Sequence, residues 1–282
     1  MLFRSRRELT LRCLRHLAET RGDAGATVAL IDAASADGTA AAVQGEFPHV
    51  RLLSVSADHW WTGAIAHGMR AAAAAGAPAV LWLNDDCLPD SGCVALLLAG
   101  ATARSPVILG ATCRDDLDRP VESAFVGRKP LSAPPSEVAN AEVSGLSGFC
   151  VAVPRAAWIK LGFPDARRFP HYAGDTAYTI AASRAGMPVR LSGNATARLS
   201  PYHERAHTIG DFLRRQPVRA RTWGAVFLGH GSPFRAATQL HYLRLRYGTI
   251  AGTVLAAARI GIWQLAFIAA AKGEARGSAT GP

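Results

Sequence analysis

The sequence predicts an α/β fold, in which a mostly parallel sheet is flanked by helices and followed by a helical carboxyl-terminal extension. Up to about residue 205, short apolar runs typical of buried strands alternate with segments of helical periodicity. The links between these segments are short, which favours parallel strands with helices on both faces. Beyond residue 205 the patterns become helical, so we expect this second part to consist of helices.

The expected elements follow one another in a regular order. Leu9, Cys13, Leu14 and Leu17 recur at helical spacing and predict a helix over 7–20. Strands are predicted over 27–32, 49–55, 79–83, 107–109, 148–153 and 188–199. Helices are predicted to end near 44, to cover 62–75 and 90–103, to begin at Pro154, and to cover 175–185. The polar segment 114–145, rich in proline and serine, is expected to form a loop or lid.

Length and composition divide the chain into two parts. The 282 residues, 49% hydrophobic and 18% charged, fit a globular protein rather than a disordered one. A chain of this length accommodates one domain of about 200 residues and an appendage. We therefore expect a domain at 1–205 and a basic, helical region at 206–282.

The second region carries most of the charge. It holds ten lysines and arginines against two acids, which gives +8 of the chain's net charge of +10. A basic segment of this kind favours an anionic partner such as a lipid surface. No nucleic-acid-binding module is recognisable, so we do not expect nucleic acid to be that partner.

A long apolar segment, 250–271, lies near the end of this region. Its length would allow a membrane span, but Arg259 at its centre and its many alanines oppose insertion. We expect instead a helix that lies on the membrane or packs against another subunit, which leaves a homo-oligomer open. Arg244 and Arg246 would add attraction to anionic lipid. The prediction is peripheral membrane contact through 244–271.

Cysteine usage and the amino terminus favour a cytoplasmic location. The five cysteines are an odd number without zinc-ligand spacing, which favours buried free thiols in a reducing compartment. The arginine-rich start lacks the apolar core of a signal peptide. We expect a cytoplasmic protein on the inner face of the cell membrane.

The most informative stretch is the predicted strand that ends at Asn84-Asp85-Asp86. Ligands of open α/β sheets gather beyond the carboxyl ends of the strands. Two adjacent carboxylates repel each other unless a cation lies near them, and a divalent cation that also binds phosphate would supply that charge. The alternative is that one of these acids caps a helix starting near Leu88-Pro89-Asp90.

Five segments resemble, in this order, motifs of glycosyltransferase family 2, which has the GT-A fold. Each alone would be weak evidence, but together they cover about 3–205 in the family's order. The segments are Arg4-Ser5-Arg6-Arg7-Glu8-Leu9, Ala29-Leu30-Ile31-Asp32-Ala33-Ala34-Ser35-Ala36-Asp37-Gly38-Thr39, Trp60-Trp61-Thr62-Gly63-Ala64, Asn84-Asp85-Asp86 and Phe169-Pro170-His171-Tyr172-Ala173-Gly174-Asp175. The third segment resembles members usually described as rhamnosyltransferase-like.

The resemblance implies inverting transfer of a sugar from a nucleotide-diphosphate donor to a glycan or lipid-linked acceptor. A Mg²⁺ or Mn²⁺ ion would neutralise the leaving diphosphate. By resemblance, Asp86 is the direct metal ligand, Asn84 takes the first position of the metal motif, and His203 is placed as a third ligand. Asp85 would approach the ribose or the donor sugar.

Further residues receive roles in the same way. Asp32 takes the place of the family's base-binding acid, with a turn-forming aspartate as the alternative. Trp61 and Gly63 lie in the turn before the second long helix, where a tryptophan ring can stack on a base or sugar. Asp175 takes the place of the catalytic acidic residue and would accept the proton of the acceptor hydroxyl. It would also suit the start of the helix that follows.

Three departures from the family pattern keep other functions open. Ala33 and Gly174 stand where the family often has Asn and Glu, and Met1 is too close to the first helix for the family's usual first strand. Either the true start lies upstream or the sheet lacks that strand. A degenerate, non-catalytic relative acting as a membrane-bound partner is one alternative. A sugar nucleotidyltransferase is another, although its glycine-rich Thr-Arg loop is missing; a dinucleotide oxidoreductase is disfavoured because no Gly-x-Gly-x-x-Gly follows a strand.

Overall fold

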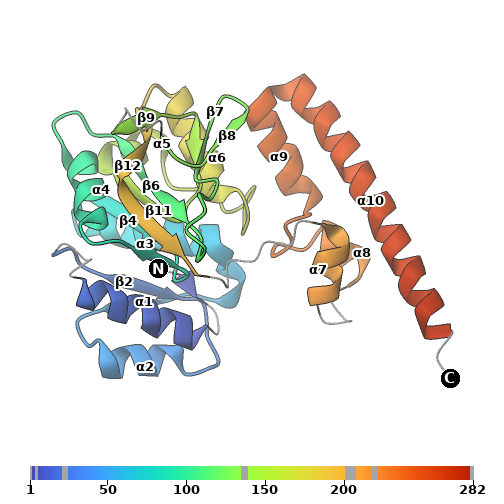
Figure 1. The fold of residues 1–282 in the computed structure, drawn as a ribbon, viewed down its shortest axis with the longest axis horizontal. Helices are drawn as coiled ribbons and strands as arrows, with labels where there is room; N and C mark the ends of the chain where they lie inside the picture. Colours follow the sequence, from blue (N-terminus) through green and yellow to red (C-terminus); the bar gives the residue numbers. More distant parts are fainter. Residues whose placement is uncertain are drawn as a thin grey trace. The chain divides into compact units, whose positions relative to one another are not determined.

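The computed structural model describes residues 2–3, 6–20, 25–134, 139–200, 208–216 and 221–279 (Figure 1). The structure divides into two compact units. Unit 1 comprises Met1–Ala166 and Gly174–His203, and unit 2 comprises Arg167–Ala173 and Glu204–Pro282. Each unit has a hydrophobic core of its own.

Unit 1 begins with a three-stranded parallel sheet in the order β1-β2-β3. β1 is two residues long and pairs with the second half of β2, where Leu2 lies opposite Ile31. The strand that the resemblance places before the first helix is therefore present in a short form. The strands are β1 (Leu2–Phe3), β2 (Ala29–Asp32) and β3 (Arg51–Ser54), and the helices that follow β1 and β2 are α1 (Arg7–Glu19) and α2 (Thr39–Glu46).

A second sheet of six strands carries the rest of unit 1. Its order is β4-β11-β6-β12-β5, with β9 also paired to β12. Among the described residues, β6 and β12 run parallel and the other four pairings are antiparallel. The sheet is mixed rather than mostly parallel because β6 and β11 are not joined by a helical crossover, so the chain returns antiparallel. The strands are β4 (Ala79–Leu83), β5 (Cys87–Pro89), β6 (Ile108–Arg114), β9 (Asn140–Glu142), β11 (Cys150–Pro154) and β12 (Val189–Leu199).

The segment expected to be a loop or lid, 114–145, contains short strands. β7 (Ala124–Val126), β8 (Lys129–Leu131) and β10 (Gly145–Leu146) form a small antiparallel sheet in the order β10-β7-β8. β7 and β8 make a hairpin with Gly127 at its turn, where φ is 57°. This two-residue glycine turn is a hairpin signal in the sequence, but the strands beside it are too short to show an alternating pattern.

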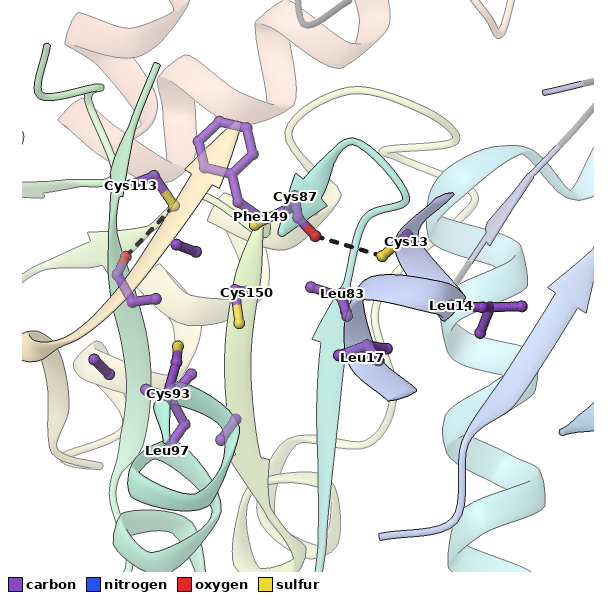
Figure 2. Close-up of a cluster of buried hydrophobic side chains, with 14 of the residues drawn as sticks. Cys13, Leu14, Leu17, Leu83, Cys87, Cys93, Leu97, Cys113, Phe149 and Cys150 are labelled. Carbon is purple, nitrogen blue, oxygen red and sulfur yellow. Dashed lines mark hydrogen bonds between the residues drawn. The ribbon is translucent and has the colours of Figure 1, made fainter. Parts of the chain in front are cut away.

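Helices cover both faces of the six-stranded sheet. Alternate residues of β11 face opposite ways, as the pleat requires. Cys150 lies in the core beneath α4 (Figure 2), and Ala152 belongs to the same core. Val151 and Val153 belong to the core beneath α3, α5 and α6. The helices are α3 (Trp60–Ala74), α4 (Cys93–Thr102), α5 (Arg155–Leu161) and α6 (Gly174–Arg184).

An apolar cavity of about 530 Å³ lies within unit 1 and is lined mainly by β2, β4, α3 and α4. None of the predicted site residues that the structure describes lines it. The cavity is therefore a packing feature of the scaffold, separate from the polar groups described below.

Unit 2 consists of helices, as its sequence pattern predicted. Its core combines Ile209, Phe227 and Phe234 with Trp263 and Phe267 of the last helix. The segment Thr249–Ala271 is long and apolar enough to cross a membrane by length and composition, and little of it is buried in the structure. The helices are α7 (Ile209–Arg215), α8 (Trp223–Phe227), α9 (Ala236–Tyr247) and α10 (Thr249–Ala279).

Candidate active site

The two adjacent acids lie in the turn between β4 and β5. The backbone N–H of Asn84 donates to Phe149 O (3.0 Å), and the N–H of Cys87 donates back to Asn84 O (3.2 Å). β5 then pairs with β12, and α4 begins later, at Cys93. The acids therefore do not cap a helix, which excludes the alternative considered from the sequence.

Arg6 provides positive charge to this pair. Its Nη2 lies 3.0 Å from Asp85 Oδ1 and 3.3 Å from Asp86 Oδ2. Both acid side chains are almost fully buried, whereas the Arg6 side chain is 38% exposed. Burial raises the pKa of Asp85 to about 8; the Arg6 guanidinium lowers it, and the neighbouring Asp86 raises it further. Arg6 stands in the first motif, directly before α1, but was not among the predicted site residues.

The chemistry of this turn fits a divalent cation that shares its coordination with phosphate. Asp85 Oδ2 is buried and has no hydrogen-bond partner among the described residues, so it can accept a further cation or donor. Within the described ranges, no group of three or more His, Cys, Asp or Glu side chains is arranged to hold a metal ion. Mg²⁺ commonly needs only one or two carboxylates when substrate phosphates complete its shell. His203, the expected third ligand, lies outside the described residues.

Trp61 connects α3 to this turn. Its indole N–H donates to Asn84 Oδ1 (2.9 Å), and its ring meets Trp82 edge to face with centroids 6.0 Å apart. Asn84 therefore uses one acceptor position of its amide to hold Trp61. The backbone of Trp60 has a φ of 49°, a strained value that places its neighbour Trp61 at the start of α3. Gly63 is buried one turn into this helix, where an added Cβ would make ordinary contacts.

Asp32 closes the carboxyl end of β2 on the other sheet. It is 5% exposed, and its Oδ1 accepts a hydrogen bond from Ser35 N–H (3.1 Å). The following turn includes Ala34 at a φ of 54°. Asp37, in the same motif, accepts bonds from Thr39 N–H (3.2 Å) and from Arg7 N–H (3.0 Å). Asp32 thus makes the hydrogen bond expected of a turn-forming aspartate, which was the alternative to its role as a base-binding acid. Asp37 fixes the start of α1.

Asp175 lies in the first turn of α6 with both carboxylate oxygens engaged. Oδ2 accepts from Gly148 N–H (2.5 Å), and Oδ1 accepts from Thr176 N–H (2.7 Å) and from the Thr176 hydroxyl (3.2 Å). The group is half-buried. These bonds fix the orientation of the carboxylate and tie α6 to the loop before β11.

Two glycines make this arrangement possible. A Cβ on Gly148 would come within 2.6 Å of Asp175 Cβ and 3.0 Å of the Trp61 ring. A Cβ on Gly174 would overlap the side chain of Thr62. Gly174, which departs from the family pattern, is therefore required by the close approach of α3 to α6. Sequence reasoning missed Gly148 and Thr62, because only the fold brings them next to Asp175.

A family model named Glycosyl transferase family 2 matches residues 2–156, more than half of the chain. The chain belongs to glycosyl transferase family 2. The matched region contains Asp32, the acid pair and Gly148, and it ends before Asp175. Comparison with curated proteins finds no significant match.

Solved structures similar to this family 2 chain are glycosyltransferases. They include GalNAc-T7 with UDP, GalNAc and Mn²⁺ (TM-score 0.59, 13% identity, 86% of this chain and 46% of that chain). A mannosyltransferase, PcManGT from Pyrobaculum calidifontis with GDP-Man and Mn²⁺, has a TM-score of 0.57 at 15% identity (100% and 74%). Residues 1–349 of TarS from S. aureus with UDP have a TM-score of 0.56 at 12% identity (86% and 69%).

The comparisons confirm the family and the GT-A fold that the resemblance implied. At these identities the structural likeness establishes the fold alone. The chain spans less than half the length of the GalNAc-T7 chain that it matches. Rhamnosyl specificity and the roles of individual site residues stay predictions.

Proposed function

We propose that the chain is an inverting, metal-assisted glycosyltransferase that uses a nucleotide-diphosphate sugar. The observation that carries the proposal is the pair of buried acids at the end of β4, beside Arg6 and connected through Trp61 and Gly148 to the fixed carboxylate of Asp175. The acid pair provides a site for a cation that would bind the donor diphosphate. Asp175 provides a base that would take the proton from the hydroxyl of the acceptor substrate.

Asp86 would hold a Mg²⁺ or Mn²⁺ ion, with Asp85 directed toward the ribose or donor sugar. When bound, the cation would neutralise charge on the departing nucleoside diphosphate. Asp32 would receive the nucleobase or ribose, and Trp61 would offer a ring surface to the donor. The nucleotide and Mn²⁺ named in the GalNAc-T7 and PcManGT structures support this class of donor and cofactor.

Asp175 is the proposed general base. Oδ1 accepts two hydrogen bonds from Thr176, whereas Oδ2 accepts one from Gly148 N–H and keeps a second lone pair for the acceptor hydroxyl. Attack of that hydroxyl on the anomeric carbon forms the new glycosidic bond, the proton passes to Asp175, and the bond to the diphosphate breaks. A single displacement of this kind inverts the anomeric configuration.

The test is a panel of UDP-, GDP- and dTDP-sugars with Mn²⁺ or Mg²⁺, scored for donor binding and nucleoside diphosphate release. Asp175→Asn is expected to lower transfer by roughly 10²- to 10⁴-fold with donor binding retained. Asp116→Asn, at an exposed turn position distant in sequence, is the control. Full transfer by Asp175→Asn would contradict its role. Release of pyrophosphate in a parallel assay with a nucleoside triphosphate and a sugar 1-phosphate, without transfer from any nucleotide sugar, would identify a nucleotidyltransferase.

We also propose that unit 2 contacts anionic membrane lipid through α9 and α10, on the cytoplasmic face of the cell membrane, where a lipid-linked acceptor is available. Ile250, Val254, Leu265 and Ile268 project within roughly 60° of one another around α10 and are exposed by 84%, 65%, 70% and 48%. The opposite side of α10 packs on the core of unit 2. The net charge of +8 over 206–282 complements an anionic surface.

Co-sedimentation with vesicles tests this contact. The full chain is expected to bind vesicles containing phosphatidylglycerol more strongly than pure phosphatidylcholine vesicles. Leu265→Glu should weaken this binding, whereas Leu117→Glu, an equally exposed leucine in unit 1, should not. Self-association measured by light scattering, without vesicle binding, would instead assign the exposed face of α10 to a second copy of the chain.

A further inference from the structure

Arg6 shares one guanidinium between two buried carboxyl groups. The same nitrogen, Nη2, lies 3.0 Å from Asp85 Oδ1 and 3.3 Å from Asp86 Oδ2, and the two acid side chains are 1% and 8% exposed. Buried carboxylates without a counter-charge are strongly unfavourable, so this contact stabilises the turn. One positive charge neutralises at most one of the two acids.

The pair also retains capacity for a further cation. In the part of the chain that the structure describes, the buried Asp85 Oδ2 has no hydrogen-bond partner. A divalent ion at the acids, with Arg6 still in contact, would bring three positive charges to two negative ones. The surplus is removed if Arg6 moves away or if an anion arrives. The diphosphate of a nucleotide sugar, which is ionised on both phosphates, is such an anion.

The Arg6 side chain is built to move without disturbing the fold. The backbone of Arg6 is anchored, because its carbonyl accepts from Thr10 N–H (3.0 Å) and from the Thr10 hydroxyl (3.1 Å). The next residue, Arg7, is held by Asp37. The side chain makes no capping hydrogen bond to α1, and it is the most exposed member of the three-residue cluster.

We propose that Arg6 is a resident counter-ion of the acid pair, which a divalent cation displaces and which then binds the donor diphosphate. This inference rests on the proposed function. It makes Arg6 a positioning residue that couples metal binding to donor binding. Binding of the cation weakens the contact between Arg6 and the acids, which favours binding of the diphosphate by Arg6. Binding of the diphosphate likewise weakens that contact, which favours binding of the cation. Metal alone should bind weakly, and metal with a nucleoside diphosphate should bind tightly.

Mn²⁺ binding, measured by electron paramagnetic resonance with and without UDP, GDP or dTDP, tests the proposal. Arg6→Gln is expected to bind Mn²⁺ roughly tenfold more tightly than wild type without nucleotide and to bind nucleotide roughly tenfold more weakly with Mn²⁺. Arg12→Gln removes the same charge from an exposed position on α1 and should resemble wild type. Unchanged or weaker Mn²⁺ binding by Arg6→Gln would overturn the role of Arg6.

A measurement on the unaltered protein covers the case in which Arg6→Gln does not fold. The side-chain Nε resonance of Arg6, assigned by comparison with Arg6→Lys, should shift when Mg²⁺ and the nucleotide bind. A fixed resonance during demonstrated binding overturns the displacement. If neither wild type nor Arg6→Gln binds Mn²⁺ with any nucleotide, the metal assignment in the proposed function fails as well, and the two failures are thereby distinguished.

Discussion

At the scale of single residues, the candidate base is defined by the small residues around it. Asp175 has its carboxylate turned toward Gly148 because that residue has no side chain, and α6 approaches Thr62 because position 174 is also glycine. The absence of an acid at position 174 therefore has a steric reason. It does not by itself make the site degenerate.

Gly148→Ala should separate orientation of the base from binding of the donor. The new Cβ would come within 2.6 Å of Asp175 Cβ and force the carboxylate to shift. We expect kcat to fall by roughly 100-fold, with little change in donor affinity, because a displacement near 1 Å has this effect on positioned groups. Gly45→Ala, in α2 with no atom within 4 Å of the new Cβ, is the control. Unchanged kcat in Gly148→Ala would contradict the assignment of Asp175.

The buried acid pair also predicts how stability depends on pH in the metal-free protein. Burial raises the pKa of Asp85 from 3.8 to about 8, so between these values the folded chain keeps a proton that the unfolded chain releases. The free energy of unfolding should therefore fall as pH rises through this window, by up to about 1.4 kcal/mol per pH unit.

Asp85→Asn should remove this part of the pH dependence. Denaturant titrations with EDTA from pH 4 to 8 would compare the variant with wild type, and the gap in unfolding free energy should widen in favour of the variant as pH rises. Parallel curves for the two proteins would contradict the effect of burial on Asp85.

At the scale of elements, periodicity located most of the strands and helices of unit 1. The helix predicted over 7–20 is α1 (Arg7–Glu19), and the strand predicted over 27–32 is β2 (Ala29–Asp32). Pairing direction was not predictable in the same way, because an apolar strand such as β11 has the same composition whether its neighbours run parallel or antiparallel. The strands in 114–145 are two or three residues long, too short for an alternating pattern.

The candidate site was likewise predictable only in part from the sequence. Asp32, Asp85, Asp86 and Asp175 could be selected from the sequence, since each stands where a strand ends or a helix begins. The residues that contact these acids in the folded chain could not be selected in this way. Arg6 reaches the acids across 80 positions of sequence, and only the folded sheet edge brings the two together.

The junction of α9 and α10 offers a test of packing in unit 2. A Cβ on Gly252 would come within 2.6 Å of Arg244 N in α9, whereas one on Gly261 would meet nothing within 4 Å. We expect Gly252→Ala to destabilise unit 2 by about 1–3 kcal/mol and Gly261→Ala to stabilise it by about 0.5–1 kcal/mol. Calorimetry of the two variants would check the signs. Equal effects would contradict the close contact of these helices.

At the scale of the whole molecule, the chain joins a catalytic unit to a basic helical one. Unit 1 contains the residues assigned to donor and base, and unit 2 contributes most of the net positive charge. We propose that unit 1 carries out glycosyl transfer and that unit 2 binds the lipid surface. Vesicle binding should therefore depend on variants of α10, and nucleotide binding should not.

The five thiols have a practical consequence for studying such a two-part molecule. Cys13, Cys87, Cys93, Cys113 and Cys150 all belong to one core of unit 1 (Figure 2), and none is more than 1% exposed. The sequence of unit 2 contains no cysteine. A thiol reagent added to the native protein should therefore react only when unit 1 opens.

Labelling with such a reagent is expected to be slow in buffer and to accelerate with denaturant along the unfolding curve of unit 1. Melting of the α9–α10 region should leave the labelling rate unchanged. Rapid reaction of any thiol in the native protein would contradict the burial of this core. The cysteines thus serve as intrinsic probes of the unfolding of unit 1, and their reactivity does not respond to the unfolding of unit 2.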